Sequence, residues 1–190
     1  MRKIYVLVAA AVLASCNQRE QETASLNSYR EKGDSIVANT FDALRNTLLR
    51  AIGEKGFPGA IEFCTANGQS LTSTYATETI SIKRTSDKLR NPANAADSME
   101  HRILATYLQL KSKKETLKPI LEKDALGTYH YFNPIIVQAM CLNCHGDQNT
   151  QIQPDTWKAI QTKYPADAAF NYKVGDLRGV WHVAFQTGEE

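Results

Sequence analysis

The stretch Cys141-Leu142-Asn143-Cys144-His145 brings two thiols and one imidazole into five consecutive residues. Cys-x-x-Cys-His is the pattern that attaches a c-type haem, because the two thiols add to the two vinyl groups of the porphyrin. The two intervening residues set the separation of the sulfurs, and the histidine that follows is held under the iron as its proximal ligand. The sequence therefore predicts one haem c, with Cys141 and Cys144 as thioethers and His145 on the iron.

Three other interpretations compete with haem. A redox dithiol of the thioredoxin type also has the Cys-x-x-Cys spacing, usually at the start of a helix. Cys64 added to Cys141, Cys144 and His145 makes a Cys₃His zinc set, although the adjacent side chains of Cys144 and His145 diverge. The third interpretation is coincidence. Haem is favoured because the chain also carries an export signal.

The N-terminus has the pattern of a secretory signal. Arg2 and Lys3 precede an apolar run over residues 4–14, which is too short for a stable transmembrane helix. The run ends in Leu13-Ala14-Ser15-Cys16, which resembles a bacterial lipobox, with an ordinary signal peptide and a chance cysteine as the alternative. We therefore predict a signal peptide over residues 1–15, a lipid on Cys16 and an extracytoplasmic, membrane-anchored protein. Asn17 leaves the choice between inner and outer membrane open.

The net charge and the number of cysteines limit which binding partners and which disulfide bonds are possible. The formal charge of +2 comes from Arg2 and Lys3, so the mature chain is near neutral, which argues against nucleic acid as a partner. The chain has four cysteines. With Cys16 lipidated and two cysteines on haem, Cys64 has no disulfide partner.

Hydrophobic periodicity predicts one α+β domain over residues 31–190, with a small antiparallel sheet, behind a flexible polar tether over residues 16–30. A long amphipathic helix is expected over residues 26–52, ended by Gly53 and Gly56, and a second helix opens at Pro58. The other expected elements are a strand over 78–84, a helix over 96–110, a β-prone segment over 127–133, a helix over 154–164 and a closing strand over 180–185.

Five motifs occur together in the chain. They are Ala60-Ile61-Glu62-Phe63-Cys64, Lys83-Arg84-Thr85-Ser86 leading to Arg90-Asn91-Pro92-Ala93-Asn94, Cys141 to Gly146, Tyr164-Pro165-Ala166-Asp167, and Gly175-Asp176-Leu177-Arg178-Gly179. In this combination and order, the chain resembles bacterial single-haem c-type domains with a PAS-like fold, which occur alone or as extracytoplasmic sensor parts of signalling proteins. The resemblance covers roughly residues 31–185. It implies a PAS-like sheet flanked by helices, and that the family's axial cysteine falls on Cys64.

The second axial ligand is the open question. Ordinary c-type cytochromes use Met or a second His, and the candidates here are Met99, Met140, His101, His130, His182 and Cys64. The resemblance and the missing disulfide partner favour Cys64, with His182 and Met99 as the alternatives. Arg84 and Arg90 are candidates to pair with the haem propionates, because guanidinium groups fit carboxylates. A surface ion pair or the bracing of a loop is the other interpretation.

These features predict a redox or small-ligand sensor, with a diatomic gas as a possible ligand and a separate redox or signalling protein as its partner. The second hypothesis is a plain electron carrier, and the third is a haem enzyme such as a peroxidase. A peroxidase needs an open distal position and a distal acid–base group, and no such pair is legible in the sequence. We therefore expect that the protein is not an enzyme.

Overall fold

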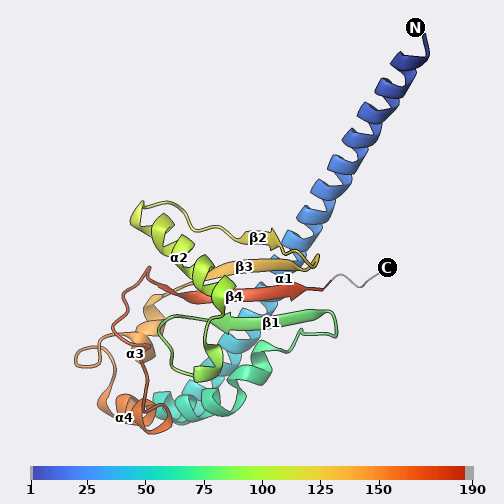
Figure 1. The fold of residues 1–190 in the computed structure, drawn as a ribbon. Coiled ribbons are helices and arrows are strands. Elements are labelled where there is room, and N and C mark those ends of the chain that lie inside the picture. Colours follow the sequence, from blue (N-terminus) through green and yellow to red (C-terminus); the bar gives the residue numbers. More distant parts are fainter. Residues whose placement is uncertain (1, 187–190) are drawn as a thin grey trace.

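The computed structural model describes the backbone of residues 2–186 and the side chains of residues 22–186. The predicted signal peptide and the proposed lipid on Cys16 thus lie outside the residues whose side chains are described. The fold is mixed α+β, as predicted (Figure 1). Its elements are α1 (Arg2–Thr72), β1 (Ile80–Thr85), the 3₁₀ turn η1 (Pro92–Asn94), α2 (Ser98–Ser112), β2 (Ile120–Lys123), β3 (Tyr129–Ile136), the 3₁₀ turn η2 (Ala139–Cys141), α3 (Leu142–His145), α4 (Pro154–Lys163) and β4 (Leu177–Phe185).

The strands form one antiparallel sheet in the order β1-β4-β3-β2. The predicted closing strand, β4, is central and begins earlier than expected, at Leu177. The sequence did not predict β2, because Ile120–Lys123 is short and lacks the alternation of a strand. Pro134 is accepted within β3 because the pairing of β2 with β3 ends at Phe132.

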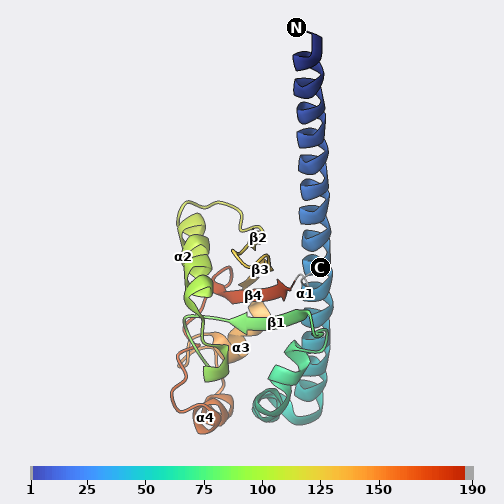
Figure 2. The same cartoon turned by 45° about the vertical axis from the view of Figure 1, so that its right-hand side comes forward.

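The two faces of the sheet are covered by different helices, and Figure 2 shows α1 on one side and α2 on the other. Under α1 the core contains Val37, Ile82, Tyr129, Tyr131, Trp181, Val183 and Phe185. Under α2 it contains Ile103, Leu104, Tyr107, Phe132 and Val180. Each such fully buried side chain stabilises the fold by about 1.5–3 kcal/mol relative to an exposed one. A PAS-like arrangement remains a prediction from the resemblance.

Helix α1 differs from the sequence prediction at both ends. Residues 22–25, predicted to be tether, are helical, and Tyr29, where the predicted tether and the predicted helix overlap, stacks on Tyr129 with ring centroids 4.1 Å apart. The helix therefore begins earlier because part of the predicted tether has an apolar partner on the sheet. Gly53 stays helical, and the break falls on Gly56, whose φ of 66° and ψ of −179° are not helical. Beyond this kink the helix continues through Pro58 to Thr72.

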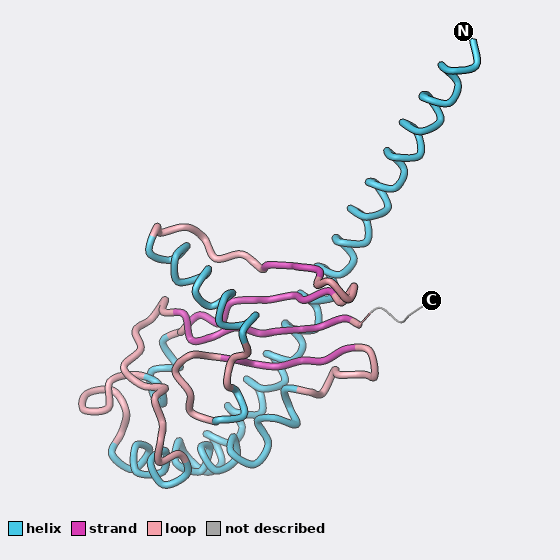
Figure 3. Tube along the Cα trace, in the orientation of Figure 1, coloured by secondary structure: helices cyan, strands magenta, loops and turns pink. Residues whose placement is uncertain are grey.

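Loops connect the elements at one end of the sheet, where the Cys-x-x-Cys-His motif lies (Figure 3). Gly179 lies inside β4. A Cβ atom there would come 2.2 Å from the Thr85 carbonyl oxygen, so glycine allows β4 to approach β1 closely. Within the part of the chain that the structure describes, no helix combines the length and apolar character needed to cross a membrane.

Candidate functional site

The motif occupies a single helical turn. Cys141 ends η2 and precedes α3, and Gly146 donates its backbone N–H to the Leu142 carbonyl oxygen at 2.9 Å. Residues three and four apart on a helix lie on one face, so Cys141, Cys144 and His145 are neighbours. Burial raises the pKa of the Cys144 thiol to about 11, although Arg90 opposes this shift. A reactive dithiol needs a lowered thiol pKa, so this thiol does not fit the thioredoxin interpretation.

His145 is held by one ring nitrogen. Its Nδ1 atom lies 2.7 Å from the carbonyl oxygen of Ala169, which can only accept, so Nδ1 carries the proton. Burial lowers the pKa of His145 well below its usual value, and the positive charges of Arg90 and Arg178 lower it further. The imidazole is therefore neutral, with Nε2 as the unprotonated nitrogen. This is the tautomer that a ligand histidine requires.

A cavity of about 180 Å³ lies beside the motif. Its lining consists of Arg84, Thr85, Ser86, Leu89, Arg90, Asn94, Ile135, Ile136, Val137, Cys141, His145 and Arg178. The Oγ1 atom of Thr85 is buried in the wall and has no hydrogen-bond partner among the described residues. A buried hydroxyl without a partner costs about 1–3 kcal/mol, so the cavity wall offers a donor to a ligand. Three guanidinium groups at one cavity favour an anionic ligand.

The three arginines also hold the walls of the cavity together. Arg84 donates to Thr72 Oγ1 at 2.9 Å and to the Gly68 carbonyl oxygen at 3.2 Å, which fastens the end of α1 to β1. Arg178 donates to Ser86 Oγ at 2.7 Å and stands over the Tyr172 ring.

The guanidinium group of Arg90 is already occupied by hydrogen bonds to other protein groups. It pairs with Asp167 through two bonds, at 2.9 and 3.2 Å, and donates to the Cys144 carbonyl oxygen at 2.6 Å. The bracing of a loop, one of the two interpretations for Arg90, is thus what its contacts favour.

Cys64 is brought to the motif by the part of α1 beyond the kink. Ile61, one turn before it, is buried in a cluster with Ile152 and Ile160, against which Cys144 packs. Burial raises the pKa of the Cys64 thiol, while Arg84 and Arg90 lower it. The charge of Cys64 also contributes to the raised pKa of Cys144, so the two thiols lie within electrostatic reach of each other.

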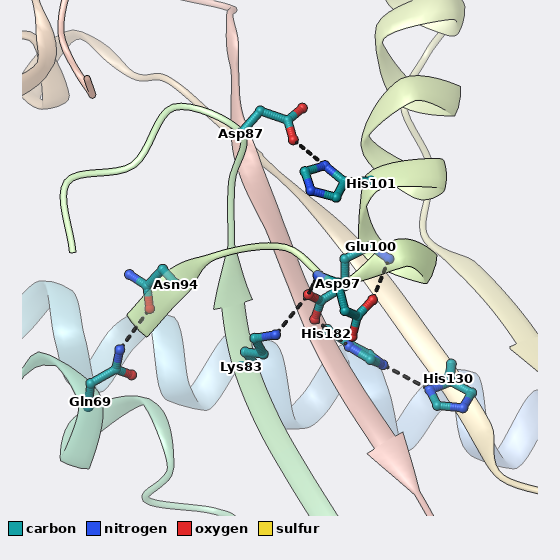
Figure 4. Close-up of polar contacts among 9 residues, drawn as sticks. All are labelled: Gln69, Lys83, Asp87, Asn94, Asp97, Glu100, His101, His130 and His182. Carbon is teal, nitrogen blue, oxygen red and sulfur yellow. Dashed lines mark hydrogen bonds and ion pairs between the residues drawn. The ribbon is translucent and has the colours of Figure 1, made fainter. Parts of the chain in front are cut away.

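The alternative distal ligands lie elsewhere. His182 and His130 are on the α2 face of the sheet, joined from Nε2 to Nδ1 at 2.9 Å, and His182 Nδ1 lies 2.8 Å from Glu100 (Figure 4). Both ring nitrogens of His182 are therefore engaged. Met99 packs against the cluster under α2, and His101 lies at the surface beside Asp87.

Zinc is not favoured at the motif. Among the described residues, the group whose ligand atoms all lie within 4.8 Å of one another is Asp97, Glu100 and His182, not the cysteines. That group is satisfied internally, because Glu100 also accepts from Lys83 Nζ at 2.8 Å and from the Asp97 backbone N–H at 2.9 Å. The ammonium group of Lys83 already neutralises the buried Glu100 carboxylate, so a metal cation is not needed there.

Sequence reasoning missed four contributors to this site, namely Thr85, Asp167, Arg178 and the carbonyl group of Ala169. Three of them stood inside the motifs that carry the family resemblance, which was a usable signal. Ala169 had none, because a backbone carbonyl leaves no mark on the sequence.

Fold and site together define a protein with a helix-covered antiparallel sheet, in which a half-buried thiol–imidazole turn adjoins an arginine-lined cavity. The Tll0287-like family model matches residues 16–185, and the chain belongs to this family. It is similar to the solved structure of the cyanobacterial heme-protein Tll0287, with 30% identity and a TM-score of 0.54 over 67% of this chain and 73% of that one. No curated protein matches the chain significantly.

Proposed function

We propose that this chain binds one haem c, attached through Cys141 and Cys144, with His145 as the proximal iron ligand. The observation that carries the proposal is the state of His145, whose Nδ1 donates to the Ala169 carbonyl oxygen at 2.7 Å beside a cavity that Cys141 also lines. The match to a solved haem protein at 30% identity supports the same cofactor. A hydrogen bond from the other ring nitrogen fixes the tautomer of a ligand histidine and raises its basicity.

The residues around the cavity fit such a group. A haem carries two propionates, and the cavity offers cationic groups with the unpartnered hydroxyl of Thr85. Arg84 and Arg178 line the cavity and would hold the carboxylates, whereas the fork of Arg90 is occupied by Asp167. The bound haem supplies an iron centre that changes by one electron and can take a small ligand.

Cys64 is the proposed second axial ligand. Its thiol interacts electrostatically with Cys144 and with the cavity arginines, so it lies near the motif. Met99 and His182 lie on the α2 side of the sheet instead. The helix segment after Gly56 holds it there, since Arg84 ties the end of that segment to β1. A thiolate donates strongly to ferric iron and lowers the potential relative to His/Met ligation.

The proposed biological role is a redox or small-ligand sensor on the extracytoplasmic side of a bacterial membrane, anchored by lipid on Cys16. Detachment of Cys64 on reduction would give the protein two states and admit a diatomic gas. The response would pass to a separate redox or signalling protein, and the role involves no catalysis and no nucleic acid.

Covalent attachment is tested by denaturing electrophoresis with haem staining and by acid acetone extraction. The wild-type protein and Cys64→Ala should both keep their haem, whereas Cys141→Ser with Cys144→Ser should lose it. Complete extraction of haem from the wild-type protein would refute the proposal.

The sensing role is tested by redox titration with absorption spectra, with and without CO. Cys64→Ala should convert the low-spin ferric spectrum to high-spin or to a new ligand set and raise the potential. Met99→Leu serves as the control and should change neither. An unchanged Cys64→Ala protein would leave Cys64 as a core residue and return His182 and Met99 to consideration.

Membrane attachment is tested separately by fractionation. Cys16→Ser should release the protein from the membrane with its haem intact, because lipid and haem use different cysteines. Continued membrane binding of this variant would contradict the anchor.

A further inference from the structure

The carbonyl oxygen of Ala169 serves two donors. His145 Nδ1 donates to it at 2.7 Å, and Arg90 Nη2 donates to it at 3.3 Å. A carbonyl oxygen that also faces a guanidinium shares its electron density with a cation, so it accepts less strongly from the imidazole. The strength of the hydrogen bond on His145 therefore depends on where Arg90 is held.

Arg90 is held by Asp167, and both side chains hydrogen-bond to the backbone of Ala169. Asp167 Oδ1 accepts from the Ala169 backbone N–H at 2.9 Å, while Arg90 reaches the carbonyl group. The side chains of Arg90 and Asp167 are only 11% and 3% exposed, so water screens their interaction weakly. Arg90 also donates to the Cys144 carbonyl oxygen at 2.6 Å, which joins this loop to the motif turn.

We propose that Arg90 and Asp167 form a positioning pair that limits the hydrogen bond between His145 and Ala169 and thereby tunes the reduction potential of the iron; this rests on the proposed function. A stronger hydrogen bond from Nδ1 makes the imidazole a more basic ligand, which stabilises ferric iron and lowers the potential. Arg90 works against this by drawing on the same oxygen. Asp167 sets how closely Arg90 approaches it.

The test compares variants of the full haem-loaded chain. Arg90→Gln should lower the midpoint potential and move the His145 Nδ1–H proton resonance downfield in the diamagnetic ferrous CO form. Asp167→Asn should do the opposite, because it removes a negative charge and leaves Arg90 free to approach Ala169. A purely structural role would loosen the loop in both variants and shift the potential in the same direction.

Lys88→Gln is the matched control. Lys88 donates to the next carbonyl oxygen of the same loop, that of Phe170, at 2.5 Å, so the variant loses the same charge without touching Ala169. It should shift the potential less than half as far as Arg90→Gln and leave the Nδ1–H resonance in place. Equal potential shifts with an unmoved resonance would overturn the inference and reduce the effect to net charge.

The remaining outcomes are also decisive. If Arg90→Gln does not fold, Arg90→Lys, which keeps the charge but not the fork, should give a smaller downward shift of the potential, and Asp167→Asn an upward one. Unchanged potentials in proteins that retain covalent haem overturn this inference alone. Absence of covalent haem from the wild-type protein overturns the proposed function instead.

Discussion

His145 and His182 stand in two differently built polar regions, and the difference shows what makes a histidine available as a ligand. His182 belongs to a saturated network, in which Glu100 takes one ring nitrogen at 2.8 Å and His130 takes the other at 2.9 Å. Among the described residues, His145 hydrogen-bonds through Nδ1 alone, to a backbone carbonyl oxygen, and it lines a cavity. The two histidines themselves are both of intermediate burial. One free ring nitrogen at a cavity therefore separates a ligand candidate from a histidine that supports the fold.

The largest difference should appear between alanine variants of the two histidines. His145→Ala removes the proposed proximal nitrogen, so the low-spin ferric absorption spectrum should be lost. His182→Ala should leave that spectrum intact and lower the free energy of unfolding instead, because Glu100 loses a buried partner. Absorption spectra and urea titrations of both variants check this. A spectral change of equal size in His182→Ala would erase the distinction between the two regions.

Glu100→Gln should be the most damaging change to the saturated network. The carboxylate accepts from His182, Lys83 and the Asp97 backbone, and a glutamine amide would turn a donor toward other donors. The expected loss in unfolding free energy is about 4 kcal/mol. Glu122→Gln is the control, since its partner Arg102 is 53% exposed and such pairs contribute about 1 kcal/mol or less. Chemical denaturation of both variants measures the contrast.

Acid should weaken the same network over a defined range. Burial raises the pKa of Glu100, but hydrogen bonds from His182 and Lys83 outweigh it and bring the value to about 2, below the usual 4.5. Because the folded-state pKa is depressed, this contribution is complete above pH 4.5 and is lost as the pH falls toward 2; it amounts to about 3 kcal/mol. Stability against pH should fall less steeply in Glu100→Gln. Parallel curves for the two proteins would contradict this.

The smallest effect belongs to the outer end of the network. His130 Nε2 lies 3.2 Å from Asp124 Oδ2, and the Asp124 side chain is 24% exposed. Asp124→Asn should therefore lower the unfolding free energy far less than Glu100→Gln does, and leave any haem spectrum unchanged. A loss as large as that for Glu100→Gln would mean that the network acts as one unit.

A structural feature could be predicted from the sequence when the residues that determine it are close together in the chain. The Cys-x-x-Cys-His turn, the break near Gly56 and the strand around His182 are local, and their patterns identified them. The pairing of Arg90 with Asp167 joins residues 77 positions apart, and no local pattern contains it. The strand β2 and the helical residues 22–25 also escaped prediction. The strand depends on its pairing with β3, and the start of the helix is stabilised by the contact of Tyr29 with Tyr129 of β3. The candidate residues of the motif could thus be named from the sequence, whereas their supporting contacts could not.

Gly56 connects the long body of α1 to the segment that carries Cys64, and its geometry has a consequence in terms of chirality. With φ at 66° and ψ at −179°, its backbone is the mirror image of the extended conformation that L-residues prefer. The nearest atom to an added L-Cβ is 3.7 Å away, so space does not exclude a side chain; handedness does. A D-amino acid would adopt these angles in its own preferred region. The direction of the cysteine-bearing segment therefore depends on the one proteinogenic residue that has no handedness.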